Sequence, residues 1–201
     1  MAIKKLVEVW DGNNIIKKNI IFLKKKTKKV LNPQSENLEQ IKKDLLDTYQ
    51  ATPCAGVAAN QIGYNQRIFI GMKNDIEEEE KSTISGNPNA NNYEFYINPT
   101  IDQSSRKSLQ EGEEGCLSIP EIRLVAERFD KIKIRYFNGE GKKIKKTISG
   151  FISRLFQHEL DHLDGKLMFD NKKIKQVYRI SDNKNIDNLY AKLMDELSKF
   201  L

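Results

Sequence analysis

The chain has 201 residues, and its 34 basic and 28 acidic side chains give a net charge of +6. Hydrophobic residues make up 38% of the chain, which is enough for a buried core, but the mean hydropathy of -0.62 is too low for a membrane protein. No apolar run approaches the ~20 residues of a membrane-spanning helix, and the apolar segment 20–23 is too short for a signal peptide. The length predicts one domain over residues 1–201.

The cysteine count and the charge distribution exclude two further classes of protein. Two cysteines, Cys54 and Cys116, are too few for a disulfide framework, so a reducing compartment is expected. A pI near 9.1 would suit a nucleic-acid-binding protein, but the lysines are scattered and an acidic run at 77–80 interrupts them. Solvated lysine faces are the commoner explanation of such a pattern, and we expect no direct DNA binding.

The first half of the chain predicts a helix followed by strands and loops. Apolar side chains recur at helical spacing between residues 38 and 49, with charged residues between them, which indicates an amphipathic helix. A loop containing Pro and Gly follows at 52–56, and the apolar segment 67–71 is typical of a strand. Residues 73–92 have almost no apolar period and predict an exposed loop. A strand pattern resumes at 95–101.

The second half predicts a hairpin and two helices. Apolar and basic residues alternate over 130–137, Asn138-Gly139 is a turn signal, and 142–148 returns as the partner strand. Residues 149–165 predict a helix with apolar side chains around most of its circumference, which should therefore be buried. Residues 187–201 predict a C-terminal amphipathic helix. The expected fold class is α+β, with mixed or antiparallel strands packed around a buried helix.

Both histidines of the chain lie in the motif His158-Glu159-Leu160-Asp161-His162. Two His four residues apart project from one face of a helix, so both rings can reach one metal ion while Glu159 reaches a water beside it. The third protein ligand must be Cys, Asp or Glu, because no other His exists. Cys116 is a candidate, although a lone Cys is more often a small buried apolar residue. An ordinary metallopeptidase remains an alternative, because such an enzyme takes its third ligand from downstream of the motif and acids occur there. These acids are Asp170, Asp182, Asp187 and Glu196.

Three short segments together resemble the motifs of one enzyme family. Glu114-Gly115-Cys116-Leu117-Ser118 resembles the central motif of the peptide deformylases, and residues 157–163, Gln-His-Glu-Leu-Asp-His-Leu, resemble their metal-binding helix. Residues 54–61, Cys-Ala-Gly-Val-Ala-Ala-Asn-Gln, resemble the family motif Gly-x-Gly-x-Ala-Ala-x-Gln. The segments occur in the family's order, and the resemblance covers a core of residues 35–170. A thiol ligand upstream of the helix is also not the pattern of the metallopeptidases.

The resemblance implies a hydrolase that removes the N-formyl group from the initiator methionine of newly made peptides and releases formate. It implies one divalent metal ion held by Cys116, His158 and His162, with Fe(II) as the native metal and Zn(II), Ni(II) or Co(II) as replacements. It makes Glu159 the general base and acid, and it makes the Gln61 amide and the Leu117 backbone N–H the donors to the oxyanion. The substrate-binding residues that it implies are Ala55, Gly56, Glu113, Gly115, Arg123, Phe151 and Leu155.

The chain departs from the family pattern at two places, and the family resemblance also suggests partners for it. Cys54 replaces the family's first motif glycine and is expected to be structural, and residues 73–92 resemble an insertion. The expected partners are N-formylmethionyl nascent peptides, in the bacterial cytoplasm or in an organelle stroma or matrix. The basic stretch 172–179 suggests a transient association with ribosomes as an accessory property. A basic RNA-associated module is the non-enzymatic alternative, with the same stretch as its best feature.

Overall fold

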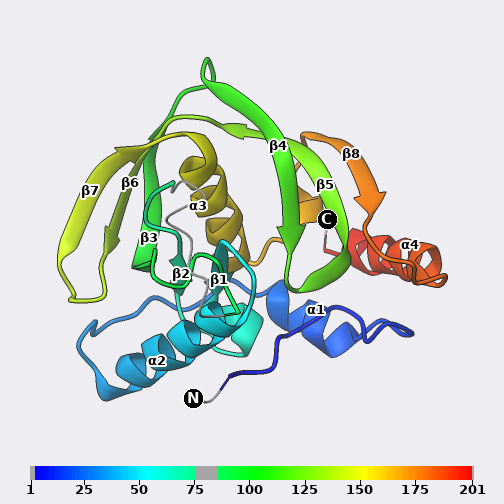
Figure 1. The fold of residues 1–201 in the computed structure, drawn as a ribbon, viewed down its shortest axis with the longest axis horizontal. Coiled ribbons are helices and arrows are strands. Elements are labelled where there is room, and N and C mark those ends of the chain that lie inside the picture. The colour runs from blue at the N-terminus through cyan, green and yellow to red at the C-terminus, as the bar shows by residue number, and fades with distance from the viewer. Residues whose placement is uncertain (1–2, 76–85, 201) are drawn as a thin grey trace.

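Two antiparallel sheets form the centre of the computed structural model, which describes residues 3–75 and 86–200 (Figure 1). The five-stranded sheet has the order β1 (Gly56–Ala58), β2 (Ile68–Gly71), β3 (Glu94–Ser104), β6 (Ile132–Phe137) and β7 (Lys143–Ile148). The three-stranded sheet has the order β4 (Leu109–Cys116), β5 (Ile119–Phe129) and β8 (Ile174–Arg179). Every pair of neighbouring strands is antiparallel. The predicted β2, β3 and the β6–β7 hairpin are confirmed, as is the α+β class.

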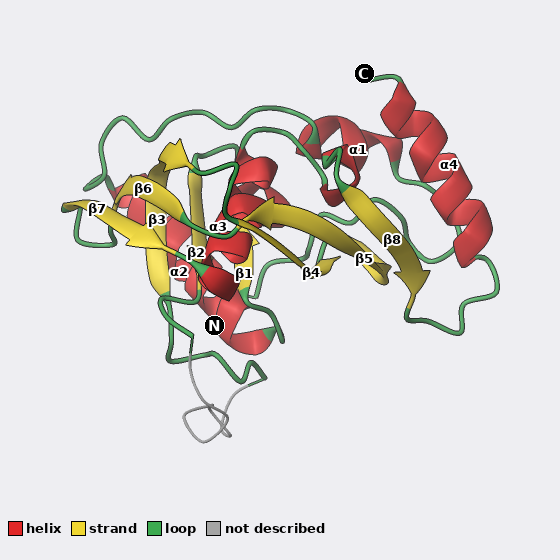
Figure 2. Cartoon of the chain, turned by 90° about the horizontal axis from the view of Figure 1, so that it is seen from above, coloured by secondary structure: helices red, strands yellow, loops and turns green. Residues whose placement is uncertain are grey.

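Helix α3 (Gly150–Leu163) lies between the two sheets (Figure 2). Its apolar side chains pack on the five-stranded sheet, where the ring of Phe156 meets the rings of Phe69 and Tyr96 edge to face. The helix ends before Gly165, which has a positive φ of +73°. A Cβ at this position would lie only 2.4 Å from the Lys24 carbonyl oxygen. Only glycine fits this turn. The predicted buried helix is confirmed, and it is enclosed by a sheet on each side.

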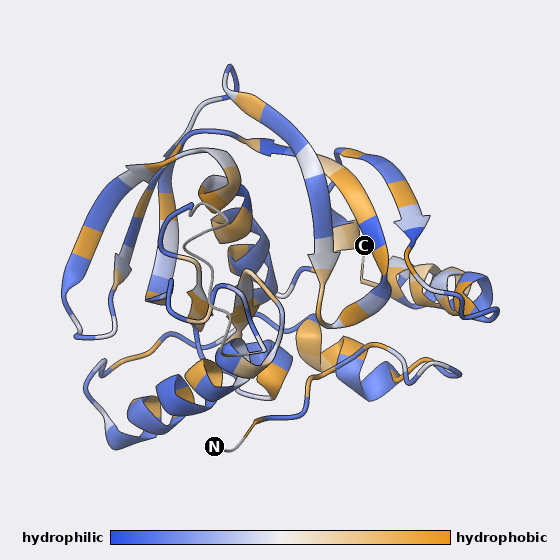
Figure 3. Cartoon of the chain, in the orientation of Figure 1, coloured by the Kyte–Doolittle hydropathy of each residue, from blue (hydrophilic) through white to orange (hydrophobic). Residues whose placement is uncertain are grey.

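The other helices cover the outer faces of the sheets. Helix α2 (Glu36–Ala51) begins at Ser35, whose hydroxyl accepts a hydrogen bond from the Leu38 N–H at 3.3 Å. Its coloring in Figure 3 is mostly hydrophilic with a hydrophobic stripe, which packs against β1 and β2. Helix α4 (Ile186–Ser198) buries apolar residues in the core of the three-stranded sheet. Both helices were predicted. None of the helices in the described ranges is long and apolar enough to cross a membrane.

Several elements differ from the sequence-based expectations. Helix α1 (Lys17–Leu23) and strands β1, β4, β5 and β8 were not predicted. Helix α1 and strand β1 are too short to show a period, and charged residues obscure the apolar period of β4, β5 and β8. The basic stretch 172–179 is largely strand β8, which pairs with β5. Cys116, which we expected in a short segment between strands, is the last residue of β4.

The predicted exposed loop 73–92 is only partly exposed. Residues 76–85 lie outside the described part of the chain. Within residues 86–92, Asn87 and Ala90 are buried. The Asn87 side-chain amide donates to the Tyr49 carbonyl at 2.7 Å and to the Cys54 carbonyl at 3.1 Å. Residues 86–92 are therefore attached, through Asn87, to the end of α2 and to the segment that leads into β1.

Candidate metal centre and active site

Three possible metal ligands converge where the end of β4 meets α3. The Cys116 sulfur and one ring nitrogen each of His158 and His162 all lie within 4.8 Å of one another, and the three residues are buried. The Cys116 Sγ lies 3.3 Å from the His162 Nε2. One thiolate and two imidazoles form a donor set that suits Zn(II) or Fe(II). The residues therefore fit a single divalent metal ion.

Glu114, two residues before Cys116, fixes the ring of His158. Its Oε2 lies 3.0 Å from the His158 Nδ1, while Arg128 donates to both of its oxygens at 2.8 and 2.9 Å and Arg154 donates to Oε1 at 2.9 Å. Burial alone would raise the pKa of Glu114, but the hydrogen bonds and charges of Arg128 and His158 outweigh it and hold that pKa well below its usual range. The Glu114 carboxylate accepts a hydrogen bond from the His158 Nδ1–H, which leaves the His158 Nε2 available to a metal ion.

The two histidines differ in their electrostatic surroundings. Burial lowers the pKa of His162 well below its usual value, and the charges of His158 and Arg128 lower it further, which favours the neutral ring that binds metals. Burial also disfavours a charged His158, but hydrogen bonds to Cys116 and Glu114 outweigh it and raise the pKa of His158 well above its usual value. Cys116 and Glu114 thus stabilise positive charge at this point, as a divalent cation requires.

Glu159 lies beside the ligand cluster without belonging to it. Its carboxyl group is buried, and Oε2 has no hydrogen-bond partner within the described part of the chain. Burial raises the pKa of Glu159 to about 7. A Cβ on Gly56 would lie 2.8 Å from Oε1, so the close approach of β1 requires a glycine there. The arrangement leaves a carboxyl group able to accept and return a proton near neutral pH.

The Gln61 side chain has a defined orientation. Gln61 lies on the short 3₁₀ helix η1 (Ala59–Ile62) after β1, and its Oε1 accepts the Ala58 N–H at 2.9 Å. Its Nε2 therefore points to the ligand cluster, 3.3 Å from the Ser118 Oγ and 3.6 Å from the Cys116 Sγ. Leu117 occupies the turn between β4 and β5, directly after the cysteine. The Gln61 amide thus lies beside the cluster, and Leu117 lines the same cavity.

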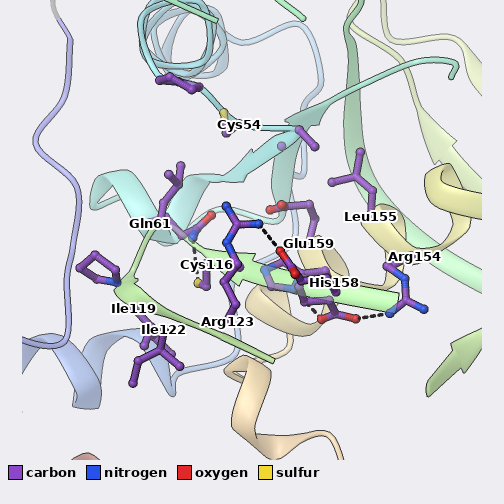
Figure 4. A pocket seen from close by; sticks show the side chains of 18 of the residues that line it. Cys54, Gln61, Cys116, Ile119, Ile122, Arg123, Arg154, Leu155, His158 and Glu159 are labelled. Atoms are coloured by element: carbon purple, nitrogen blue, oxygen red, sulfur yellow. Dashed lines mark hydrogen bonds and ion pairs between the residues drawn. The ribbon is translucent and has the colours of Figure 1, made fainter. Parts of the chain in front are cut away.

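A cavity of about 400 Å³ opens onto this cluster (Figure 4). It is lined by every residue predicted for the site except His162, which is buried beneath it. These residues are Ala55, Gly56, Gln61, Glu113, Gly115, Cys116, Leu117, Arg123, Phe151, Leu155, His158 and Glu159. Cys54 also lines the cavity, and Figure 4 places it toward α2, apart from Cys116. Phe151 lines the cavity and is 43% exposed.

Two predicted substrate-binding residues pair with each other in this structure. The Arg123 Nη1 donates to the Glu113 Oε1 at 2.6 Å, and both side chains are exposed at the rim of the cavity. A Cβ on Gly115 would meet only the Arg123 side chain, at an ordinary contact distance of 3.7 Å. The free protein thus has room for a side chain at position 115.

None of the downstream acids of the metallopeptidase alternative lines the cavity. Asp170 pairs with Lys24, Asp187 with Arg179, and Glu196 with Lys17 and Lys199. The structure brings Cys116, and none of these acids, to the two histidines. Sequence reasoning gave no role to Glu114, Arg128 and Arg154. Glu114 stands in the quoted motif, whereas the signal of Arg128 and Arg154 is only a charge pattern on β5 and α3.

Comparisons with known proteins agree with the motifs. The family model "Polypeptide deformylase" matches residues 13–179. The peptide deformylase of Thermotoga petrophila is 35% identical over 160 residues, which cover 80% of this chain and 82% of that protein. The peptide deformylase of Elusimicrobium minutum is 35% identical over 176 residues, which cover 85% of this chain and 88% of that protein.

Solved structures show the same fold. A crystal structure of the Thermotoga maritima peptide deformylase matches with a TM-score of 0.68 and 29% identity, over 88% of this chain and 100% of that one. A Met-Ala-Ser-bound peptide deformylase from Acinetobacter baumannii matches with a TM-score of 0.66 and 25% identity, over 85% of this chain and 98% of that one. The chain therefore belongs to the peptide deformylases, hydrolases that remove the N-formyl group from newly made peptides.

Proposed function

We propose that this chain hydrolyses the formyl amide of N-formylmethionyl peptides with one divalent metal ion held by Cys116, His158 and His162. The observation that carries the proposal is the convergence of these three donors beside Glu159, a buried acid whose Oε2 has no partner in the described structure. A divalent metal in such a site supplies Lewis acidity to water and to a carbonyl oxygen. The chain's own side chains supply the proton transfers and the orientation of the substrate.

Glu159 is the proton carrier of the proposed reaction. Its carboxylate removes a proton from the attacking water, the water oxygen bonds to the formyl carbon, and the proton then passes to the amine as the carbon–nitrogen bond breaks. The products are formate and a peptide with a free amino terminus. A pKa near 7 suits both steps, because such a group accepts and donates protons with similar ease at neutral pH.

Gln61 and Leu117 are the proposed donors to the oxyanion. The Gln61 amide is held by its own Oε1, so that Nε2 faces the reacting centre without having to reorient. The Leu117 N–H follows the Cys116 ligand on the turn between β4 and β5. Fixed donors of this kind favour the transition state over the planar formyl group, and each is typically worth ~3 to 4 kcal/mol of barrier.

The cavity supplies the proposed binding site for the methionine side chain. Ala55, Phe151, Leu155 and the ring of His158 form an apolar wall of this cavity. Glu113, Gly115 and Arg123 lie along its rim, where Gly115 gives a peptide close access to β4 and Arg123 can donate to peptide carbonyls. The Met-Ala-Ser bound to the Acinetobacter baumannii relative supports a methionyl peptide as the ligand.

The metal and the setting of the reaction are also part of the proposal. The thiolate and imidazole donors accept several divalent metals, and the family resemblance favours Fe(II) as the native one, with Zn(II), Ni(II) or Co(II) as replacements. The substrates are nascent chains in the bacterial cytoplasm or in an organelle. The basic stretch 172–179, which includes β8, favours a transient association with the ribosome as an accessory property.

Replacement of Glu159 tests this proposal. Anaerobically purified wild-type protein should contain one metal per chain and release formate from formyl-Met-Ala-Ser. Glu159→Ala should keep the metal and lose ~10²- to 10⁴-fold in turnover, the contribution of a positioned general base. Glu140→Ala, which removes an exposed acid in a turn, is the matched control and should match the wild type. Near-normal turnover of Glu159→Ala with its metal retained would contradict the assigned role.

A further inference from the structure

The amino-terminal segment hydrogen-bonds to both parts of the chain that carry the proposed oxyanion donors. The Val7 N–H donates to the Gln61 carbonyl at 2.8 Å, and the Val9 N–H donates to the Ser118 carbonyl at 2.9 Å. Gln61 follows β1 of the five-stranded sheet, whereas Ser118 forms the turn between β4 and β5 with Leu117. Three consecutive residues thus connect two donor segments that belong to different sheets.

The segment is held at both of its ends. On one side, the Lys4 N–H donates to the Thr48 hydroxyl at 3.3 Å, and the Lys4 ammonium pairs with Asp44 on α2 at 3.3 Å. On the other side, the Ile16 N–H donates to the Val9 carbonyl at 2.7 Å, and the Val9 side chain is fully buried. The segment is thus anchored on both sides of the Val7 N–H, at Lys4 and at Val9.

We propose that residues 7–9 are positioning residues, which set the separation of the Gln61 amide and the Leu117 N–H through these two backbone hydrogen bonds. The inference rests on the proposed function, because it gives the two donors their role. Between the donor segments themselves, the Gln61 Nε2 lies 3.3 Å from the Ser118 Oγ, and Leu117 packs against the apolar cluster that includes Ala59 and Ile62. Neither contact is a backbone hydrogen bond. The Gln61 amide is itself a donor to the oxyanion, so its backbone needs independent support.

The catalytic consequence follows from the sensitivity of oxyanion stabilisation to distance. The donors act on charge that develops only in the transition state, so a displaced donor lowers kcat more than it raises KM. A displacement of about 1 Å at a reacting centre can cost ~10²-fold in rate. Loss of the Val7 N–H should therefore lower kcat at least about tenfold, while the metal ligands, which lie on β4 and α3, stay in place.

The test is a double-mutant cycle between Val7 and Gln61. Val7→Pro removes the N–H, and Lys5→Pro places the same ring at an exposed residue of the same segment as the control. We expect Val7→Pro to lower kcat for formyl-Met-Ala-Ser with KM and metal content nearly unchanged, and Lys5→Pro to match the wild type. In a Gln61→Ala background, Val7→Pro should lower kcat little further, because its effect on kcat passes through Gln61.

A backbone ester in place of the Val7 amide provides a second variant should Val7→Pro unfold. The ester keeps the valine side chain and replaces the N–H with an oxygen, which cannot donate, and it should reproduce the loss of kcat. Unchanged kcat in the ester variant would overturn the inference, and so would an equal loss in the wild-type and Gln61→Ala backgrounds, since that is the pattern of a general structural role. Absence of formate release by the wild type would instead contradict the proposed function.

Discussion

The Glu114 Oε2 lies 3.0 Å from the His158 Nδ1, and the chain carries Glu114 only two residues before Cys116. One strand end, that of β4, therefore supplies both a metal-ligand candidate and the hydrogen-bond partner of a second candidate on α3. Arg128 and Arg154 balance the Glu114 charge at hydrogen-bond distance. The spacing of the motif thus couples the position of the sulfur to the orientation of an imidazole ring.

Replacement of Glu114 by Gln tests this coupling. The variant keeps the size of the side chain but removes the negative charge that orients His158 and makes its ring more basic. We expect the affinity for Zn(II) or Co(II) to fall ~10- to 100-fold, the usual effect of losing such a partner. Competition with a chelator measures the affinity, and circular dichroism verifies that the variant is folded.

Glu113→Gln is the matched control for that change. It removes a neighbouring charge whose partner, Arg123, is exposed at the cavity rim. Its metal affinity should equal that of the wild type. Equal affinities of the Glu114 and Glu113 variants would mean that the ring of His158 needs no partner at Nδ1.

Replacement of Cys116 and replacement of Cys54 should have opposite outcomes for the metal content of the protein. Cys116→Ala removes the sulfur 3.3 Å from the His162 Nε2 and should abolish stoichiometric metal. Cys54→Ala should retain it, because burial raises the pKa of the Cys54 thiol and so disfavours the thiolate that binds metals. Metal analysis of both variants after anaerobic purification is the measurement. Full occupancy in Cys116→Ala would revive a ligand set that does not include this sulfur.

Asn87 should contribute to stability although it lies far along the chain from the residues that it contacts. Its amide donates to the buried Tyr49 carbonyl and to the Cys54 carbonyl, which also accepts from the Asn89 amide. Asn87→Ala therefore removes the donor of the buried Tyr49 carbonyl. We expect the free energy of unfolding to fall by about 2 kcal/mol, within the usual cost of such a loss. Urea denaturation measures it. Asn91→Ala, an exposed position in the same loop, should change it by less than about 0.5 kcal/mol, and similar effects of the two changes would count against this role.

Local periodicity predicted the parts of the fold that depend on local sequence. The His158–His162 spacing and the apolar residues of α3 follow from helical geometry, so the helix and its two candidate ligands were evident. The third candidate, Cys116, depended on a resemblance of motifs. The pairing of Glu114 with Arg128 and Arg154 could not be predicted, because it requires β4, β5 and α3 to meet.

Strands β4 and β8 show a different limit of sequence reasoning. In β4 the less exposed positions are Gln110, Gly112, Glu114 and Cys116, so few apolar residues mark its inward face. In β8 two adjacent residues, Lys175 and Gln176, are both exposed, which breaks the alternation. Such strands lack the alternation that identified β6. Helix α1 escaped prediction for a related reason, since its seven residues are too few to show a helical period.

The comparison of formyl-Met-Ala-Ser with acetyl-Met-Ala-Ser tests the central claim most directly. A formyl carbon carries a hydrogen where an acetyl carbon carries a methyl group. We expect the site formed by Gly56, Gln61 and Leu117, which all line the cavity, to admit the first group and to exclude the second. The account predicts release of formate and intact Met-Ala-Ser from the formyl peptide, and almost no reaction of the acetyl peptide. Comparable rates on both peptides, or cleavage between Met and Ala, would contradict it.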